Sequence, residues 1–314
     1  MRLLLLLSAT VLSTASAGAI GQAARPTFNT GVDLVTVVAT VTDARGRLVP
    51  GLTRDDFEVT DRGEVRAISE FRVERAPLSV AILVDASGSM TMADRAAAAR
   101  MTAAHLLSGL EAGTDEAAIY TFDTRLHEVA PFTVDTRAAQ GALGEVEPFG
   151  ATSLHDAVAE TARRVAARTG RRRAVVVVTD GVDTASRRTP AEVSAMASAI
   201  DVPVYVLATV LPIDDPGVGG RAPRVSAGTA TTRELARWTG GAFHFVSTPS
   251  ASIRAAGVVL AELRHQYLIA FEPGAGDGWH PIEVRARRKH LTVRARGGYM
   301  VAAARPFIGI EEAS

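Results

Sequence analysis

The sequence of 314 residues contains no cysteine. This absence excludes a disulfide scaffold, a thiolate metal site and a cysteine nucleophile. It also excludes a lipoprotein anchor, which is attached to a cysteine at the cleavage point. Stability must therefore come from a buried core, and hydrophobic residues make up 47% of the chain, enough to form one.

An excess of charge of either sign is also absent. The chain has 34 basic and 34 acidic side chains, so its formal net charge is zero. This balance gives no general attraction to nucleic acid or to an anionic membrane. Charged residues make up 22% of the chain, an ordinary share for a globular protein, so we do not expect most of the chain to be disordered.

Only the first residues form a long apolar stretch. Arg2 precedes the apolar residues Leu3 to Leu7, and Ala15-Ser16-Ala17 supplies the small residues of a cleavage site. This pattern predicts a signal peptide at residues 1–17, cleaved after Ala17, and a secreted or periplasmic mature protein. An uncleaved anchor is the alternative, but the continuous apolar part is well short of the ~20 residues that a membrane span needs. We expect no transmembrane segment in the mature chain.

The rest of the chain changes its pattern at Pro77 and again near Gln266. Alternating β-branched residues before Pro77 predict short strands, and three more strands are predicted after residue 265. Because both β segments lie outside the α/β segment between them, we expect them to pack together. The predicted domains are a flexible lead-in at 18–30, an N-terminal β unit at 31–76, an α/β domain at 77–265, C-terminal strands at 266–303 and a tail at 304–314.

The α/β segment contains two continuous apolar runs, Val80 to Val84 and Ala174 to Val178. Runs that are apolar on both faces are typical of central strands in a parallel sheet. Further strands and helices alternate with them, which predicts a doubly wound (Rossmann-like), mostly parallel sheet with helices on both faces. The helices are predicted at 93–110, 136–146, 154–168, 190–200, 232–239 and 252–264.

Oxygen-bearing side chains follow both apolar runs. Asp85-Ala86-Ser87-Gly88-Ser89 comes directly after the first run, Asp180 follows the second, and Thr152 lies just before a predicted helix. Ligands of open α/β sheets bind at the carboxyl ends of the strands. Two carboxylates and three hydroxyls suit Mg²⁺ or Mn²⁺ rather than Zn²⁺. An ion with so few anionic ligands stays under-neutralised and attracts a further carboxylate from outside.

Asp85, Ser87, Ser89, Thr152 and Asp180 together resemble the metal-ion-dependent adhesion site of the von Willebrand factor type A (VWA) family. The resemblance covers about residues 78 to 265. It implies that the two serines and the threonine bind the cation directly, that the two aspartates often act through water, and that a Glu or Asp of a partner completes the shell. In relatives, movement of the last helix, here 252–264, is often coupled to the site.

The flanking segments resemble a narrower group, the von Willebrand factor A-related acidobacterial secreted proteins. This resemblance covers nearly the whole mature chain but implies no settled biochemical role. The residues that carry it are Leu52, Asp56-Phe57, Pro77 to Val80, Gln266 to Leu268 and Arg294 to Tyr299.

The sequence therefore predicts cation-dependent binding of a protein or another carboxylate-bearing ligand, and not an enzyme. One alternative is a structural assembly module that acts through its β unit. Another is a metal-assisted hydrolase, which needs a base, and His155 is the histidine nearest in sequence to a motif residue. Basic runs at 163–173 and 285–290 favour solvated surfaces over a polyanion site.

Overall fold

The computed structural model describes residues 34–73, 75–144, 148–210 and 227–301. The predicted signal peptide, its cleavage after Ala17, the lead-in at 18–30 and the tail at 304–314 lie outside these residues. So do residues 211–226. Within the described residues, no helix has both the length and the apolar character needed to cross a bilayer.

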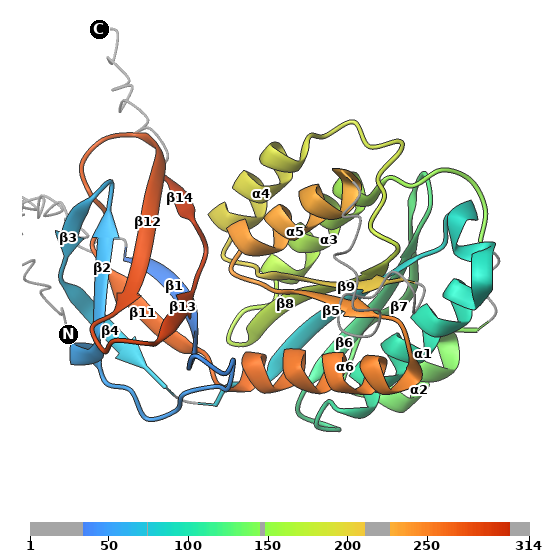
Figure 1. Cartoon of the computed structure of the whole chain (residues 1–314), viewed down its shortest axis with the longest axis horizontal. Coiled ribbons are helices and arrows are strands. Elements are labelled where there is room, and N and C mark those ends of the chain that lie inside the picture. The colour runs from blue at the N-terminus through green and yellow to red at the C-terminus, as the bar shows by residue number, and fades with distance from the viewer. Residues whose placement is uncertain (1–33, 74, 145–147, 211–226, 302–314) are drawn as a thin grey trace, which may run out of the picture. The chain divides into compact units, whose positions relative to one another are not determined.

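A sheet of six strands in the order β10-β9-β8-β5-β6-β7 forms the centre of the α/β part (Figure 1). All neighbouring strands are parallel except β6 and β7, which are antiparallel. Every residue of β5 is buried, as expected for a strand covered on both faces. The strands are β5 (Leu78–Asp85), β6 (Glu116–Phe122), β7 (Leu126–Thr133), β8 (Arg172–Thr179), β9 (Val204–Thr209) and β10 (Phe243–Val246).

Helices cover both faces of this sheet (Figure 1). Val80, Ile82 and Val84 belong to one apolar cluster, and the alternating Ala81 and Leu83 belong to another. The first cluster includes α1 (Arg95–Ser108), α2 (Thr136–Ala142) and α6 (Pro249–Arg264), and the second includes α3 (Leu154–Ala166), α4 (Pro190–Ala199) and α5 (Ala227–Trp238). The predicted doubly wound fold is confirmed.

Two antiparallel sheets combine strands that precede the α/β part in the sequence with strands that follow it. Their strand orders are β13-β1-β11-β4 and β14-β12-β2-β3. They enclose a third apolar cluster, which includes Val37, Phe57, Tyr267 and Ile282. The predicted β unit from N- and C-terminal segments is confirmed as part of the fold class, whereas the exact domain limits stay a prediction. The strands are β1 (Val35–Thr42), β2 (Phe57–Asp61), β3 (Glu64–Arg66), β4 (Ile68–Arg72), β11 (Tyr267–Phe271), β12 (Gly278–Ala286), β13 (Thr292–Arg294) and β14 (Gly298–Val301).

The core of the β unit contains a buried polar cluster. Asp61 accepts a hydrogen bond from the Tyr299 hydroxyl at 2.7 Å, and Nδ1 of His280 lies 2.9 Å from its other oxygen. Nε2 of His280 lies 2.8 Å from the carbonyl oxygen of Gly276, so both ring nitrogens have a partner. Burial alone would raise the pKa of Asp61, but hydrogen bonds, led by that of Tyr299, outweigh it and lower this pKa. The polar atoms of this cluster have hydrogen-bond partners within the β unit, so the role of the cluster is structural.

Candidate metal site at the carboxyl ends of the central strands

Asp85 is the last residue of β5, and its side chain is held by two neutral donors. The backbone N–H of Ser87 donates to Oδ1 at 2.9 Å, and the hydroxyl of Thr179, the last residue of β8, donates to Oδ2 at 2.5 Å. Asp85 is only 2% exposed. The carboxylate is therefore fixed between the ends of the two strands whose apolar runs the sequence displays.

Burial is the largest influence on the charge of Asp85. It raises the pKa of this carboxyl to about 6, against the hydrogen bonds from Ser87 and Thr179 and with a smaller contribution from the charge of Asp180. A buried carboxylate bonded only to neutral groups lacks a compensating positive charge. A bound cation supplies such a charge, so the environment of Asp85 fits a metal ion.

The hydroxyls of Ser87 and Ser89 lie side by side, with their Oγ atoms 3.1 Å apart. A neighbouring loop is bonded to this segment, because Gly88 N–H donates to Gly150 O at 2.9 Å and Phe149 N–H donates to Ala86 O at 2.8 Å. A Cβ atom on Gly88 would lie 3.2 Å from Gly150 O, so the close approach of the two loops favours glycine. The loop leading to Thr152 is thus anchored on the serine loop.

Thr152 is buried and is positioned by the loop that follows β8. Its N–H donates to the hydroxyl of Thr184 at 2.9 Å, and its carbonyl accepts the N–H groups of Thr184 and Ala185, each at 2.9 Å. Asp180 begins this same loop. The structure therefore connects Thr152 to the Asp180 loop by hydrogen bonds, and the 148–152 loop to the serine loop.

Asp180 has a cationic neighbour from the protein itself. Nη1 of Arg95, the first residue of α1, lies 3.3 Å from Oδ2 of Asp180. Both side chains are largely buried, with 17% and 6% of their surfaces exposed. Of the two carboxylates in the predicted site, one is therefore paired with an arginine and the other is bonded to neutral groups.

The donor set of the predicted site contains three hydroxyls and two carboxylates. In the described part of the chain, no group of three or more His, Cys, Asp or Glu side chains could hold a metal ion. The predicted site differs from such a group because it contains only two carboxylates, and its other three ligands are hydroxyls. Oxygen donors of this type suit Mg²⁺ or Mn²⁺.

Sequence reasoning missed the residues that hold the Asp180 loop. Asp183 accepts hydrogen bonds from the N–H of His155 at 3.0 Å and from the hydroxyl of Ser186 at 2.6 Å. Burial alone would raise the pKa of Asp183, but these bonds and the His155 side chain outweigh it and hold this pKa well below its usual range. The sequence feature that could have indicated this contact is Asp183 itself, a second acidic residue three positions after Asp180.

His155 does not pair with the serines in the way that a catalytic base would. Its Nδ1 lies 3.0 Å from Oδ2 of Asp183, and among the described residues its buried Nε2 has no hydrogen-bond partner. The observed role of His155 is to hold Asp183.

Much of the charge in the two basic runs is used within the fold. Arg168 donates to both oxygens of Glu116, at 2.7 and 2.6 Å, and Arg164 lies 3.2 Å from Glu160. In the second run, arginines pair with acidic side chains of the β unit, and the pairs are Arg285–Glu283, Arg287–Glu58 and Arg288–Asp56. This pairing agrees with the interpretation of these runs as solvated surfaces rather than a polyanion site.

Residues 80–182, which include all five predicted ligands, match the family described as von Willebrand factor type A domain. The chain contains a VWA domain. The comparison with curated proteins found no match. The narrower resemblance to the acidobacterial secreted proteins stays a prediction.

Solved structures similar to the chain include two bacterial proteins and a protein of a parasite. An aerotolerance-related membrane protein of Bacteroides fragilis is 24% identical, with 59% of this chain and 98% of that chain covered and a TM-score of 0.49. A von Willebrand factor type A protein of Catenulispora acidiphila is 14% identical, with coverage of 85% and 72% and a TM-score of 0.49. The manganese-loaded TRAP protein of Plasmodium vivax is 14% identical, with coverage of 74% and 98% and a TM-score of 0.45.

Proposed function

We propose that the chain is a secreted or periplasmic binding protein that captures a carboxylate of a protein partner through Mg²⁺ or Mn²⁺. The cation is held by Asp85, Ser87, Ser89, Thr152 and Asp180. The buried carboxylate of Asp85, bonded only to neutral donors beside two adjacent hydroxyls, carries this proposal. The VWA domain match over the same residues supports it.

The chain's own groups would orient the ligands and limit their charge. Thr179 and the backbone of Ser87 fix Asp85, and Thr184 fixes Thr152. With one of the two carboxylates already paired with Arg95, the set neutralises a divalent ion incompletely. An ion held by these residues would attract the carboxylate of an incoming Asp or Glu. This mechanism needs no base and no nucleophile, so under the proposal the chain is not an enzyme.

Calorimetric titration of the chain with Mg²⁺ and with Mn²⁺ tests the site, beside the variants Asp85→Ala and Asp180→Ala. We expect saturable binding in the wild type that is lost in both variants. Asp277→Ala, which removes an exposed carboxylate of the β unit, is the matched control and should bind as the wild type does. Equal binding in all four proteins would overturn the assignment of the ligands.

The effect of chelation on partner binding separates this proposal from a structural assembly module. A partner that needs the metal should be released by EDTA and should not bind the Asp180→Ala variant. If partner binding survives both treatments, the metal is not the point of contact, and the β unit is the surface to map.

A further inference from the structure

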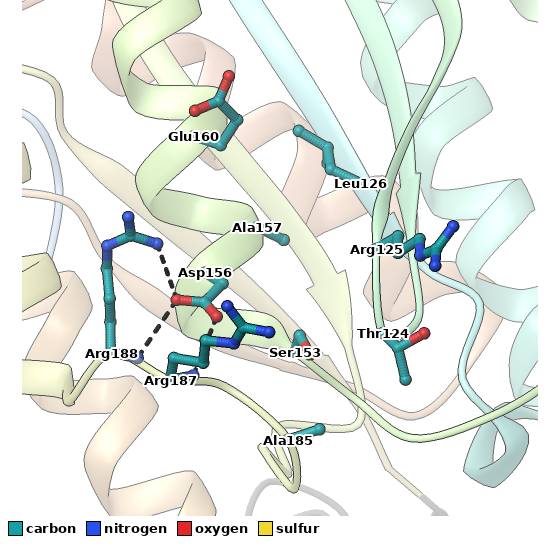
Figure 2. Close-up of a pocket in the computed structure, with 10 residues that line it drawn as sticks. All are labelled: Thr124, Arg125, Leu126, Ser153, Asp156, Ala157, Glu160, Ala185, Arg187 and Arg188. Carbon is teal, nitrogen blue, oxygen red and sulfur yellow. Dashed lines mark hydrogen bonds and ion pairs between the residues drawn. The ribbon is translucent and has the colours of Figure 1, made fainter.

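An open pocket of about 740 Å³ lies beside the proposed metal site (Figure 2). One wall is formed by α3 and the loop after β8, and the other by the turn between β6 and β7. Ala185, on the first wall, donates its N–H to the carbonyl of Thr152. Thr124, on the second wall, has Cγ2 3.9 Å from the point where a Cβ of Gly150 would lie. The pocket therefore adjoins the loops that carry the predicted metal ligands.

The acidic groups that line this pocket are already neutralised. Asp156 accepts the backbone N–H groups of Arg187 at 2.9 Å and Arg188 at 3.2 Å, and the guanidinium of Arg188 at 2.9 Å (Figure 2). Burial alone would raise the pKa of Asp156, but these bonds outweigh it and lower this pKa. Glu160 is paired with Arg164 at 3.2 Å. Neither carboxylate needs a cation from outside.

Two lining arginines have no such pairing. Among the described residues, the guanidinium groups of Arg125 and Arg187 form no hydrogen bond or ion pair, and both residues are exposed. Figure 2 shows the Arg187 side chain reaching past Asp156 toward Ser153, whereas that of Arg125 extends away from α3. Arg187 thus places an unpaired positive charge in the pocket, and its side chain extends toward Ser153, the residue that follows the proposed ligand Thr152.

We infer that this pocket holds a second acidic side chain of the partner, near in sequence to the residue that reaches the metal. This inference rests on the proposed function. The planar guanidinium of Arg187 matches a carboxylate in geometry and can donate two parallel hydrogen bonds to it. Leu126 and Ala157 supply apolar surface for the methylene groups of a Glu. The partner is then a protein segment that carries two acidic residues.

Blocked peptides test this inference by NMR titration of the full chain, in Mg²⁺ and in EDTA. One peptide carries a single Asp among glycines and serines, and the others carry an additional Glu at one to four residues from that Asp. The proteins are the wild type, Arg187→Gln and Arg254→Gln. Arg254 is an exposed arginine of α6, on the opposite face of the central sheet, so its variant loses the same charge away from the pocket.

With the wild type and with Arg254→Gln, we expect at least one two-acid peptide to bind about fivefold more tightly than the one-acid peptide, as expected for one partly exposed ion pair. With Arg187→Gln this gain should disappear, while the binding of the one-acid peptide stays unchanged. An equal gain in all three proteins would overturn the pocket as a subsite. So would a failure of every peptide to bind at millimolar concentration.

The same experiment separates the failure of the pocket from the failure of the metal site. If the metal proposal is wrong and the pocket is right, the one-acid peptide will bind no better in Mg²⁺ than in EDTA, yet the gain from the second acid will still need Arg187. If only the pocket proposal is wrong, binding will need Mg²⁺ and Arg187→Gln will leave the gain intact.

Discussion

Nη1 of Arg95 lies 3.3 Å from Oδ2 of Asp180, so the first residue of α1 supplies a cation to one of the two carboxylates proposed to bind metal. A guanidinium and a divalent ion next to the same carboxylate repel each other. The repulsion is strong because both side chains are largely buried and poorly screened by water. Under the proposed function, Arg95 should therefore limit the affinity for the metal.

Removal of this charge should strengthen metal binding. We expect Arg95→Gln to bind Mg²⁺ and Mn²⁺ about tenfold more tightly than the wild type, a change of about 1.4 kcal/mol that is modest for a charge at this distance. Calorimetric titration measures the change. Arg137→Gln, which removes an exposed arginine of α2, should leave the affinity unchanged. Weaker metal binding in Arg95→Gln would instead show that Arg95 positions Asp180.

Asp85 should lower the stability of the protein when no metal is bound. Its carboxylate is buried and bonded only to neutral donors, so replacement by the neutral, isosteric Asn removes a desolvation cost. We expect metal-free Asp85→Asn to unfold in urea at the same concentration as the wild type or a higher one. Addition of Mg²⁺ should stabilise only the wild type, since binding to the native state shifts its unfolding equilibrium. A large loss of stability in the metal-free variant would contradict this account.

Two glycines of the α/β part should respond to alanine in opposite directions. A Cβ on Gly241, just after α5, would lie 2.0 Å from the carbonyl oxygen of Val204, so Gly241→Ala should destabilise the fold by about 3 kcal/mol. A Cβ on Gly257, in the middle of α6, would meet nothing within 4 Å. Gly257→Ala should therefore stabilise the fold by about 0.5–1 kcal/mol, because alanine loses less backbone entropy in a helix. Urea unfolding measures both changes, and changes of equal sign would count against the packing described.

His244 on β10 should make the stability depend on pH. Burial, with a smaller contribution from Arg294, lowers the pKa of His244 to about 4, whereas an unfolded histidine titrates near 6.5. Between pH 4 and 6.5 only the unfolded state takes up the proton. The contribution of His244 to the free energy of unfolding is therefore fully present above pH 6.5 and is lost as the pH drops toward 4. The loss due to this half-buried residue should be on the order of 2 kcal/mol.

Urea unfolding from pH 4.5 to 7.5 measures this effect in the wild type and in His244→Gln. The variant should have a smaller loss of stability below pH 6.5. His127→Gln, which replaces a largely exposed histidine, should follow the wild type. Identical pH profiles for all three proteins would show that His244 is not the group responsible.

The sequence pattern was sufficient for the two strands at the centre of the sheet, because β5 and β8 each contain a continuous apolar run. The predictions failed where local sequence does not decide the structure. A helix was expected from residue 93, but Asp94 has φ of 57°, and the segment Gly88–Asp94 before it is a 3-10 helix. α5 begins at Ala227, whereas the predicted start was residue 232. The prediction was late because the residues of the first turn show no apolar periodicity. β14 was not predicted, since its short segment is defined by its pairing with β12.

The predicted metal site illustrates the same limit. Residue spacing selected Asp85 and Asp180 as candidate ligands, because each directly follows a continuous apolar run. It could not identify the contacts that hold Thr152, which come from Thr184 and Ala185 on a loop without periodicity. The pairing of Arg95 with Asp180 joins residues far apart in the sequence, and no local pattern specifies it.

The position of β1 has a consequence for the order of events during biosynthesis. β1 pairs with β11 on one edge and with β13 on the other, for example through Val35 with Phe271 and Thr40 with Arg294. Both partners follow the entire α/β part in the chain. While the ribosome is still making that domain, the nascent β1 has no strand to bond with, and its exposed edges are open to aggregation. The β unit is therefore completed only after synthesis reaches the last strands, which favours a chaperone that shields the first strands until then.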